Sequence, residues 1–94
     1  MKLLAMTLVA SIGLVAANVS HAQEALAKSS GCLNCHALDT KKMGPSFKDI
    51  AAKYKGNAGA EASLVAKLTD AKGHPAIKAS PDDIKSLVKW VLSM

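Results

Sequence analysis

Residues 32–36 read CLNCH, and this pentapeptide decides the fold. Cys32 and Cys35 stand three positions apart, so a short helical turn places both thiols on one side. The spacing C-x-x-C-H is typical of a c-type haem attachment site, in which each thiol adds to one vinyl group of a haem. The next residue, His36, then lies under the ring and can bind the iron on its proximal face. The motif predicts one covalent haem c.

Three other interpretations of the same residues compete with haem attachment. A thioredoxin-like redox pair would require a βαβ context, and the sequence shows no β alternation. A structural zinc site would require four ligands, and by count the chain supplies them as Cys32, Cys35, His36 and His74. A disulfide between the two cysteines would close a very small loop and constrain the chain little. An exported chain of this size favours the haem, because a large apolar cofactor supplies core that a small domain lacks.

The N-terminus reads MKLLAMTLVASIGLVAANVSHA, residues 1–22. Lys2 precedes an apolar run over residues 3–19, and Ser20 and Ala22 are small residues at the −3 and −1 positions of a cleavage site. This pattern predicts a secretory signal peptide that is cleaved after Ala22. A retained membrane anchor is the alternative, although a run of about 17 residues is short for a bilayer. Cleavage leaves residues 23–94 as one periplasmic domain without stable membrane association.

The rest of the chain predicts an all-α fold. Gly44-Pro45 is a break, and Gly73 is placed to stop the helix before it. The last helix has the clearest start, with Ser80 as N-cap, Pro81 at its first position, and acidic residues in its first turn. Apolar residues recur at helical spacing rather than in alternation. The four short helices are expected at residues 24–30, 47–54, 60–71 and 81–92.

Charge narrows the range of partners. Removal of Lys2 leaves eleven of the twelve basic residues against seven carboxylates, so the formal charge falls from +5 to +4. All eleven are lysines, scattered along the chain with few aromatic residues between them, which is not the pattern of a nucleic-acid surface. The excess positive charge instead favours weak steering toward acidic partners.

The stretch CLNCHALDTKKMGPSFKDIAAKY, together with the C-terminal DDIKSLVKWVLS, resembles the small class I bacterial cytochromes c of the c551/c552 type. The similarity covers nearly all of residues 23–94. It implies a class I cytochrome c fold of four short helices around one covalently attached haem, and a soluble electron carrier rather than an enzyme. It also implies that the first helix packs across the last, that Trp90 packs near the haem, and that the Pro45 carbonyl accepts a hydrogen bond from Nδ1–H of His36.

The resemblance fails at one position, the distal iron ligand. The family places a methionine in a proline-flanked loop before the last helix, whereas residues 69–81, TDAKGHPAIKASP, contain none. This loop also looks shorter and lacks the family's tryptophan. His74 lies in the corresponding loop and is the expected distal ligand, with Met43 as the fallback. Met94, Lys78 and an open or water-bound iron remain as further alternatives. Imidazole in place of thioether predicts a lowered reduction potential.

Two functions follow from these expectations. The first is a one-electron carrier between redox proteins, with a docking rim at the lysines that flank the two ligand loops: Lys41, Lys42, Lys72 and Lys78. The second is a haem-based protein that binds or senses CO, NO or O2, or the haem subunit of an oxidoreductase complex, and it requires a labile distal site. The sequence supplies no acid–base pair beyond the ligands and no nucleotide-binding loop.

Overall fold

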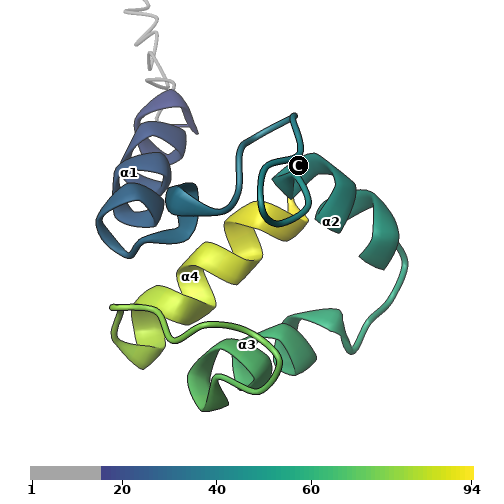
Figure 1. The fold of residues 1–94 in the computed structure, drawn as a ribbon. Coiled ribbons are helices and arrows are strands. Elements are labelled where there is room, and N and C mark those ends of the chain that lie inside the picture. Colours follow the sequence, from purple (N-terminus) through teal and green to yellow (C-terminus); the bar gives the residue numbers. More distant parts are fainter. Residues whose placement is uncertain (1–15) are drawn as a thin grey trace, which may run out of the picture.

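The chain is seen in a computed structural model that describes residues 16–94, so most of the predicted signal peptide (residues 1–22) lies outside the described residues. The described part contains no strand, which confirms the all-α prediction. Its elements are α1 (Ala16–Ser29), a 3-10 turn η1 (Cys32–Asn34), α2 (Phe47–Tyr54), α3 (Ala60–Asp70) and α4 (Pro81–Leu92) (Figure 1). Within residues 16–94, no helix is both long enough and apolar enough to cross a membrane.

Helix α4 forms the centre of the fold, and α1, α2 and α3 all pack against it (Figure 1). Its apolar stripe buries Ile84, Leu87 and Val88. The other helices contribute mostly small residues to the core, such as Ala27 of α1 and Ala60 of α3, so their backbones approach α4 closely. Each large aliphatic side chain buried in this way contributes about 1.5–3 kcal/mol to stability.

The expected crossing of the first and last helices is confirmed. Gln23 Nε2 in α1 donates a hydrogen bond to Ser86 Oγ in α4, at 2.7 Å. The helix is longer than the expected 24–30, since it is described from Ala16 onward and runs through the predicted cleavage position. The sequence between residues 16 and 30 contains no glycine or proline that would interrupt it.

The predicted cap of α4 is confirmed, and α2 has a cap of the same kind that was not predicted from the sequence. Ser80 Oγ accepts from Asp83 N at 3.2 Å with Pro81 in the first turn, and Ser46 caps α2 in the same way. The end of α3 differs from expectation. The helix stops at Asp70, and Ala71 rather than Gly73 is its C-cap, with a left-handed φ of 53°. Gly73 makes a second left-handed turn at φ 69°, so two reversals of the backbone precede His74.

Candidate functional site

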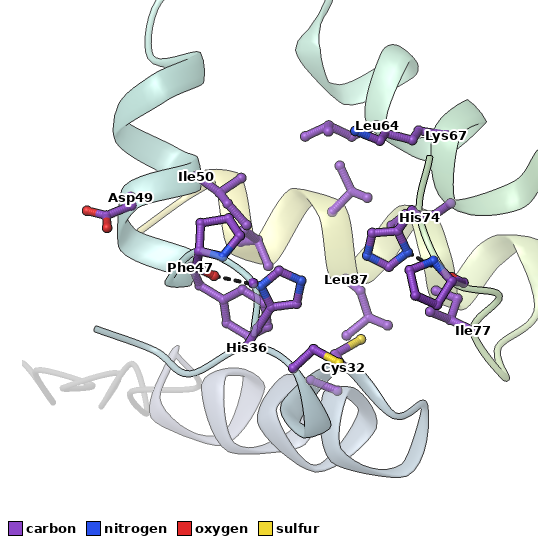
Figure 2. Close-up of a pocket in the computed structure, with 18 of the residues that line it drawn as sticks. Cys32, His36, Phe47, Asp49, Ile50, Leu64, Lys67, His74, Ile77 and Leu87 are labelled. Carbon is purple, nitrogen blue, oxygen red and sulfur yellow. Dashed lines mark hydrogen bonds between the residues drawn. The ribbon is translucent and has the colours of Figure 1, made fainter. Parts of the chain in front are cut away.

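A cavity of about 590 Å³ lies between the CLNCH turn, helices α2, α3 and α4, and the loop that follows α3 (Figure 2). Most of its lining is apolar, including Leu64, Leu87 and Val88. The same lining contains both cysteines and both histidines that the sequence singled out. Residues far apart in the chain therefore meet at one site of a size typical for ligand pockets.

The CLNCH turn brings its reactive groups to one wall of this cavity. Gly31 at φ 89° turns the chain from α1 into η1, and the backbone N–H groups of Cys35 and His36 both donate to the Cys32 carbonyl, at 3.3 and 3.0 Å. Both thiols are free and partly exposed. Burial raises the pKa of the Cys32 thiol above its ordinary value, and a backbone hydrogen bond partly opposes the rise. The thiol is therefore neutral at pH 7, as suits its apolar surroundings.

Two alternatives for the motif do not survive this geometry. The two cysteines are free rather than joined in a disulfide. Within residues 16–94, no group of three or more His, Cys, Asp or Glu side chains is arranged to hold a metal ion. The four-ligand zinc site that the residue count allowed therefore finds no support in residues 16–94.

His36 is held from three sides. Its Nδ1 donates to the Pro45 carbonyl at 2.6 Å. Gly44 lies against the ring so closely that an added Cβ would be 2.5 Å from Cε1 of His36. The Phe47 ring stacks on the imidazole at 5.4 Å between centroids, and Trp90 meets Phe47 edge-on at 5.7 Å. Trp90 also lines the cavity, so it supports the His36 wall through Phe47.

His74 occupies the opposite wall. Its ring centroid lies 6.1 Å from that of His36, and the two ring planes differ by only 4°. Its Nδ1 lies 2.7 Å from the Pro75 carbonyl oxygen. Figure 2 shows the two imidazoles pointing toward each other across the cavity, each with Nδ1 turned outward to its proline carbonyl.

The other distal candidates lie elsewhere. Met43 is at the rim of the cavity with 86% of its surface exposed. Met94 follows α4 and lines a separate, smaller pocket. Lys78 is exposed and is tied to the turn after α1 by its backbone, whose N–H donates to the Ser30 carbonyl at 3.4 Å. Of the candidates in the loop after α3, the structure brings His74 alone to the cavity wall.

The arrangement fits the haem that the motif predicts. An imidazole nitrogen binds a transition metal at about 2 Å and lies about 1.1 Å from its ring centre, so two rings on one metal have centres about 6 Å apart. The observed 6.1 Å matches that separation. Cys32 and Cys35 are the groups that would tether the haem edge, and His36 is the group that would bind its iron.

Sequence reasoning missed two contacts at this site. It did not foresee that the Pro75 carbonyl meets His74, because a backbone acceptor has no signature in the sequence. It treated Gly44 only as a break, whereas the glycine leaves room for the His36 ring. The signal available in the sequence for the Gly44 contact was the glycine–proline pair Gly44-Pro45 in the loop that follows His36.

Comparison with known proteins identifies the relatives of the chain. The family model described as cytochrome c matches residues 23–94. Cytochrome c-551 of Pseudomonas aeruginosa is 44% identical over 77 residues, which covers 74% of each chain. Cytochrome c-552 of Hydrogenobacter thermophilus is 38% identical over 96 residues, or 93% of this chain and 94% of that protein. The crystal structure of the class 1 cytochrome MtoD from Sideroxydans lithotrophicus superposes with a TM-score of 0.66 at 39% identity, covering 78% of this chain and 92% of that one.

Proposed function

The chain belongs to the cytochrome c family, whose members carry one covalently attached haem c. From this premise we propose that it is an exported one-electron carrier whose haem iron is bound by His36 and His74. Its homologues are small electron-carrier cytochromes. Bound haem supplies the one-electron couple. In the proposal Cys32 and Cys35 fix the haem, and the Pro45 carbonyl orients His36.

One observation carries the ligand assignment, the opposition of the two imidazoles at 6.1 Å. A carbonyl oxygen can only accept a hydrogen bond, so both Nδ1 atoms carry a proton, and Nε2 is left in each ring as the nitrogen for a metal. A neutral imidazole with a free Nε2 is the form that binds a metal. Trp90 and Phe47 complete the apolar wall beside His36.

The identity of the two ligands affects the reduction potential of the haem. Methionine–histidine ligation raises the potential of a haem, so a second imidazole in place of the thioether lowers it. With haem bound, His36 and His74 would both hold its iron and would leave no place there for a substrate, which suits a carrier rather than an enzyme. The chain is in this proposal a low-potential member of its family.

The proposed location is the periplasm, after cleavage of the signal peptide behind Ala22. Export is supported by the N-terminal sequence, which has the plan of a secretory signal peptide. The proposed partners are redox proteins with acidic surfaces, met through a small and transient contact. Their contact rim is the set of exposed lysines beside the two ligand loops: Lys41, Lys42, Lys72 and Lys78.

The experiment is low-temperature EPR of the ferric holoprotein with an optical spectrum beside it. We expect a low-spin signal from two nitrogen ligands and no red charge-transfer band of iron–methionine ligation. If that band appeared, the distal iron ligand would be Met43 or Met94 instead of His74. A high-spin ferric signal, with rapid CO binding to the ferrous protein, would replace the carrier by a ligand-binding or sensor protein.

A further inference from the structure

We propose that Pro75 is a positioning residue for the distal histidine: its ring fixes the backbone that presents His74, and its carbonyl holds the imidazole parallel to that of His36. The inference rests on the proposed role of His74 as iron ligand. It adds a residue for which nothing in the motif or the family resemblance gives a function.

The first support is the symmetry of the two hydrogen bonds. His36 Nδ1 donates to the carbonyl of Pro45 at 2.6 Å, and His74 Nδ1 to the carbonyl of Pro75 at 2.7 Å. The two bonds fix the same tautomer in both rings. A metal-bound histidine commonly donates its other N–H to a carbonyl or carboxylate, which sets the ring orientation and raises its basicity. Pro75 supplies on one side of the cavity what Pro45 supplies on the other.

The second support is the restriction that proline places on its neighbours. The pyrrolidine ring holds φ of Pro75 near −65°. It also disfavours the α region for the preceding residue and so holds His74 in an extended backbone directly after the left-handed Gly73. The side chain and the carbonyl of adjacent residues are thereby kept in one relative geometry.

The third support is the scarcity of other restraints on the loop. Between residues 72 and 79, the described backbone makes one hydrogen bond to another element, from Lys78 N to Ser30 O at 3.4 Å. Helix α3 covers this side of the cavity with Leu64 and Lys67 (Figure 2). Apolar packing limits where the ring lies, but it selects neither the tautomer nor the direction of Nε2. The bond to Pro75 selects both.

The consequence is spectroscopic. With haem bound, two imidazoles whose ring planes are 4° apart would align their π orbitals in one direction, and the ferric protein would then give a rhombic low-spin signal. A freely turning His74 would give a spread of angles. It would also leave its position more often and admit an added ligand.

The test compares three variants of the full holoprotein. Pro75→Ala keeps the carbonyl but frees φ, and Pro75→Gly frees the backbone further. Pro81→Ala is the matched control, because Pro81 is an exposed proline beyond the same loop that does not line the cavity. The readouts are the EPR g values and line widths of the ferric form, and the rate of CO binding to the ferrous form.

We expect a rhombic signal in the wild type and in Pro81→Ala. In Pro75→Ala the largest g value should shift and broaden, and CO should bind about tenfold faster, because the freed backbone no longer holds the carbonyl against Nδ1; this is the low end of the effects that follow when an outer-shell partner is weakened. Pro75→Gly should show a larger shift in g value, broader lines and faster CO binding than Pro75→Ala. Unchanged signals and rates in both Pro75 variants would overturn the inference while leaving bis-histidine ligation standing. If the wild type lacked two nitrogen ligands, both the role of Pro75 and bis-histidine ligation would be wrong.

A second measurement does not depend on how the variants fold. In the diamagnetic ferrous wild type, NMR should find the Nδ1–H protons of His36 and His74 both protected from exchange with solvent. Protection at His36 alone would mean that the bond to Pro75 does not form in solution, and the positioning role would be wrong.

Discussion

His36 and His74 approach one cavity from opposite sides, with ring centroids 6.1 Å apart and planes within 4° of parallel. One belongs to the CLNCH turn and the other to the loop after α3, so the pair exists only because α3 and α4 bring that loop back over the turn. The spacing suits one metal between two imidazoles. Replacing the distal member is the most direct way to measure what the pair does.

His74→Met should raise the reduction potential by about 0.1–0.2 V, a modest part of the roughly 0.8 V range that axial ligands set. The reason is that a thioether donates less charge to the iron than an imidazole. Protein-film voltammetry of the wild type and the variant measures the difference. His74→Ala should instead give a haem that binds CO readily. An unchanged potential in the methionine variant would show that His74 is not a ligand.

Gly44→Ala should destabilise the holoprotein by about 1–3 kcal/mol, the usual cost of forcing atoms into a packed site. The added Cβ would stand 2.5 Å from Cε1 and 2.9 Å from Nδ1 of His36. The ring cannot yield freely, because Pro45 holds its Nδ1. Guanidinium unfolding followed by fluorescence measures the loss.

Gly59→Ala is the control for that substitution. Its Cβ would meet only Asn57 Oδ1, at an ordinary 3.6 Å, and its φ of −90° suits any residue. Its free energy of unfolding should change by less than about 1 kcal/mol. Equal losses in the two variants would mean that contact with His36 is not what excludes a side chain at Gly44.

The fold was largely predictable because each helix carries a local signal. Ser80-Pro81 and the acidic turn after it mark the start of α4, and the spacing of Ile84, Leu87 and Val88 marks its buried face. The start of α1 was not predictable in this way, because a cleavage site is recognised by small residues and contains no helix stop. Alanine-rich sequence therefore continues the helix through Ala22.

The candidate site was predictable only in part. The C-x-x-C-H spacing identifies Cys32, Cys35 and His36 because the chemistry of attachment fixes their order. The sequence could place His74 in the right loop, but not on the cavity wall, because that depends on how the chain leaves α3. The turn was assigned to Gly73, whereas Ala71 makes the first reversal at φ 53°. A non-glycine residue in this conformation runs against the usual preference, which is why the sequence pointed to Gly73 instead.

Ala71→Gly should stabilise the protein by about 0.5–1 kcal/mol. A left-handed conformation costs a non-glycine residue about 1–2 kcal/mol, and the larger chain entropy that glycine loses on folding offsets part of the gain from removing that cost. Thermal unfolding of the holoprotein measures the gain. The control is Ala66→Gly, at an exposed position inside α3, which should cost about 1 kcal/mol. A loss at both positions would mean that Ala71 is not strained.

Electron transfer to an acidic redox protein should slow as salt is added, because the lysine rim attracts that partner through water. Two of its members lie on different ligand loops. Lys42 precedes Gly44 on the His36 side and is anchored by its Nζ, which donates to the Leu33 carbonyl at 3.1 Å. Lys72 precedes His74 on the other side and is exposed.

Replacement of Lys42 and Lys72 by glutamine should together lower the second-order rate about three- to tenfold at low ionic strength, as expected when two exposed charges each contribute up to about 1 kcal/mol. Stopped-flow mixing over a salt series measures the rate. The control is Lys85→Gln, an exposed lysine of α4 that does not line the cavity, and its rate should stay within twofold of the wild type. Since all three changes remove the same charge, equal slowing by Lys85→Gln and by each rim variant alone would trace the effect to net charge and contradict a docking rim beside the two histidine loops.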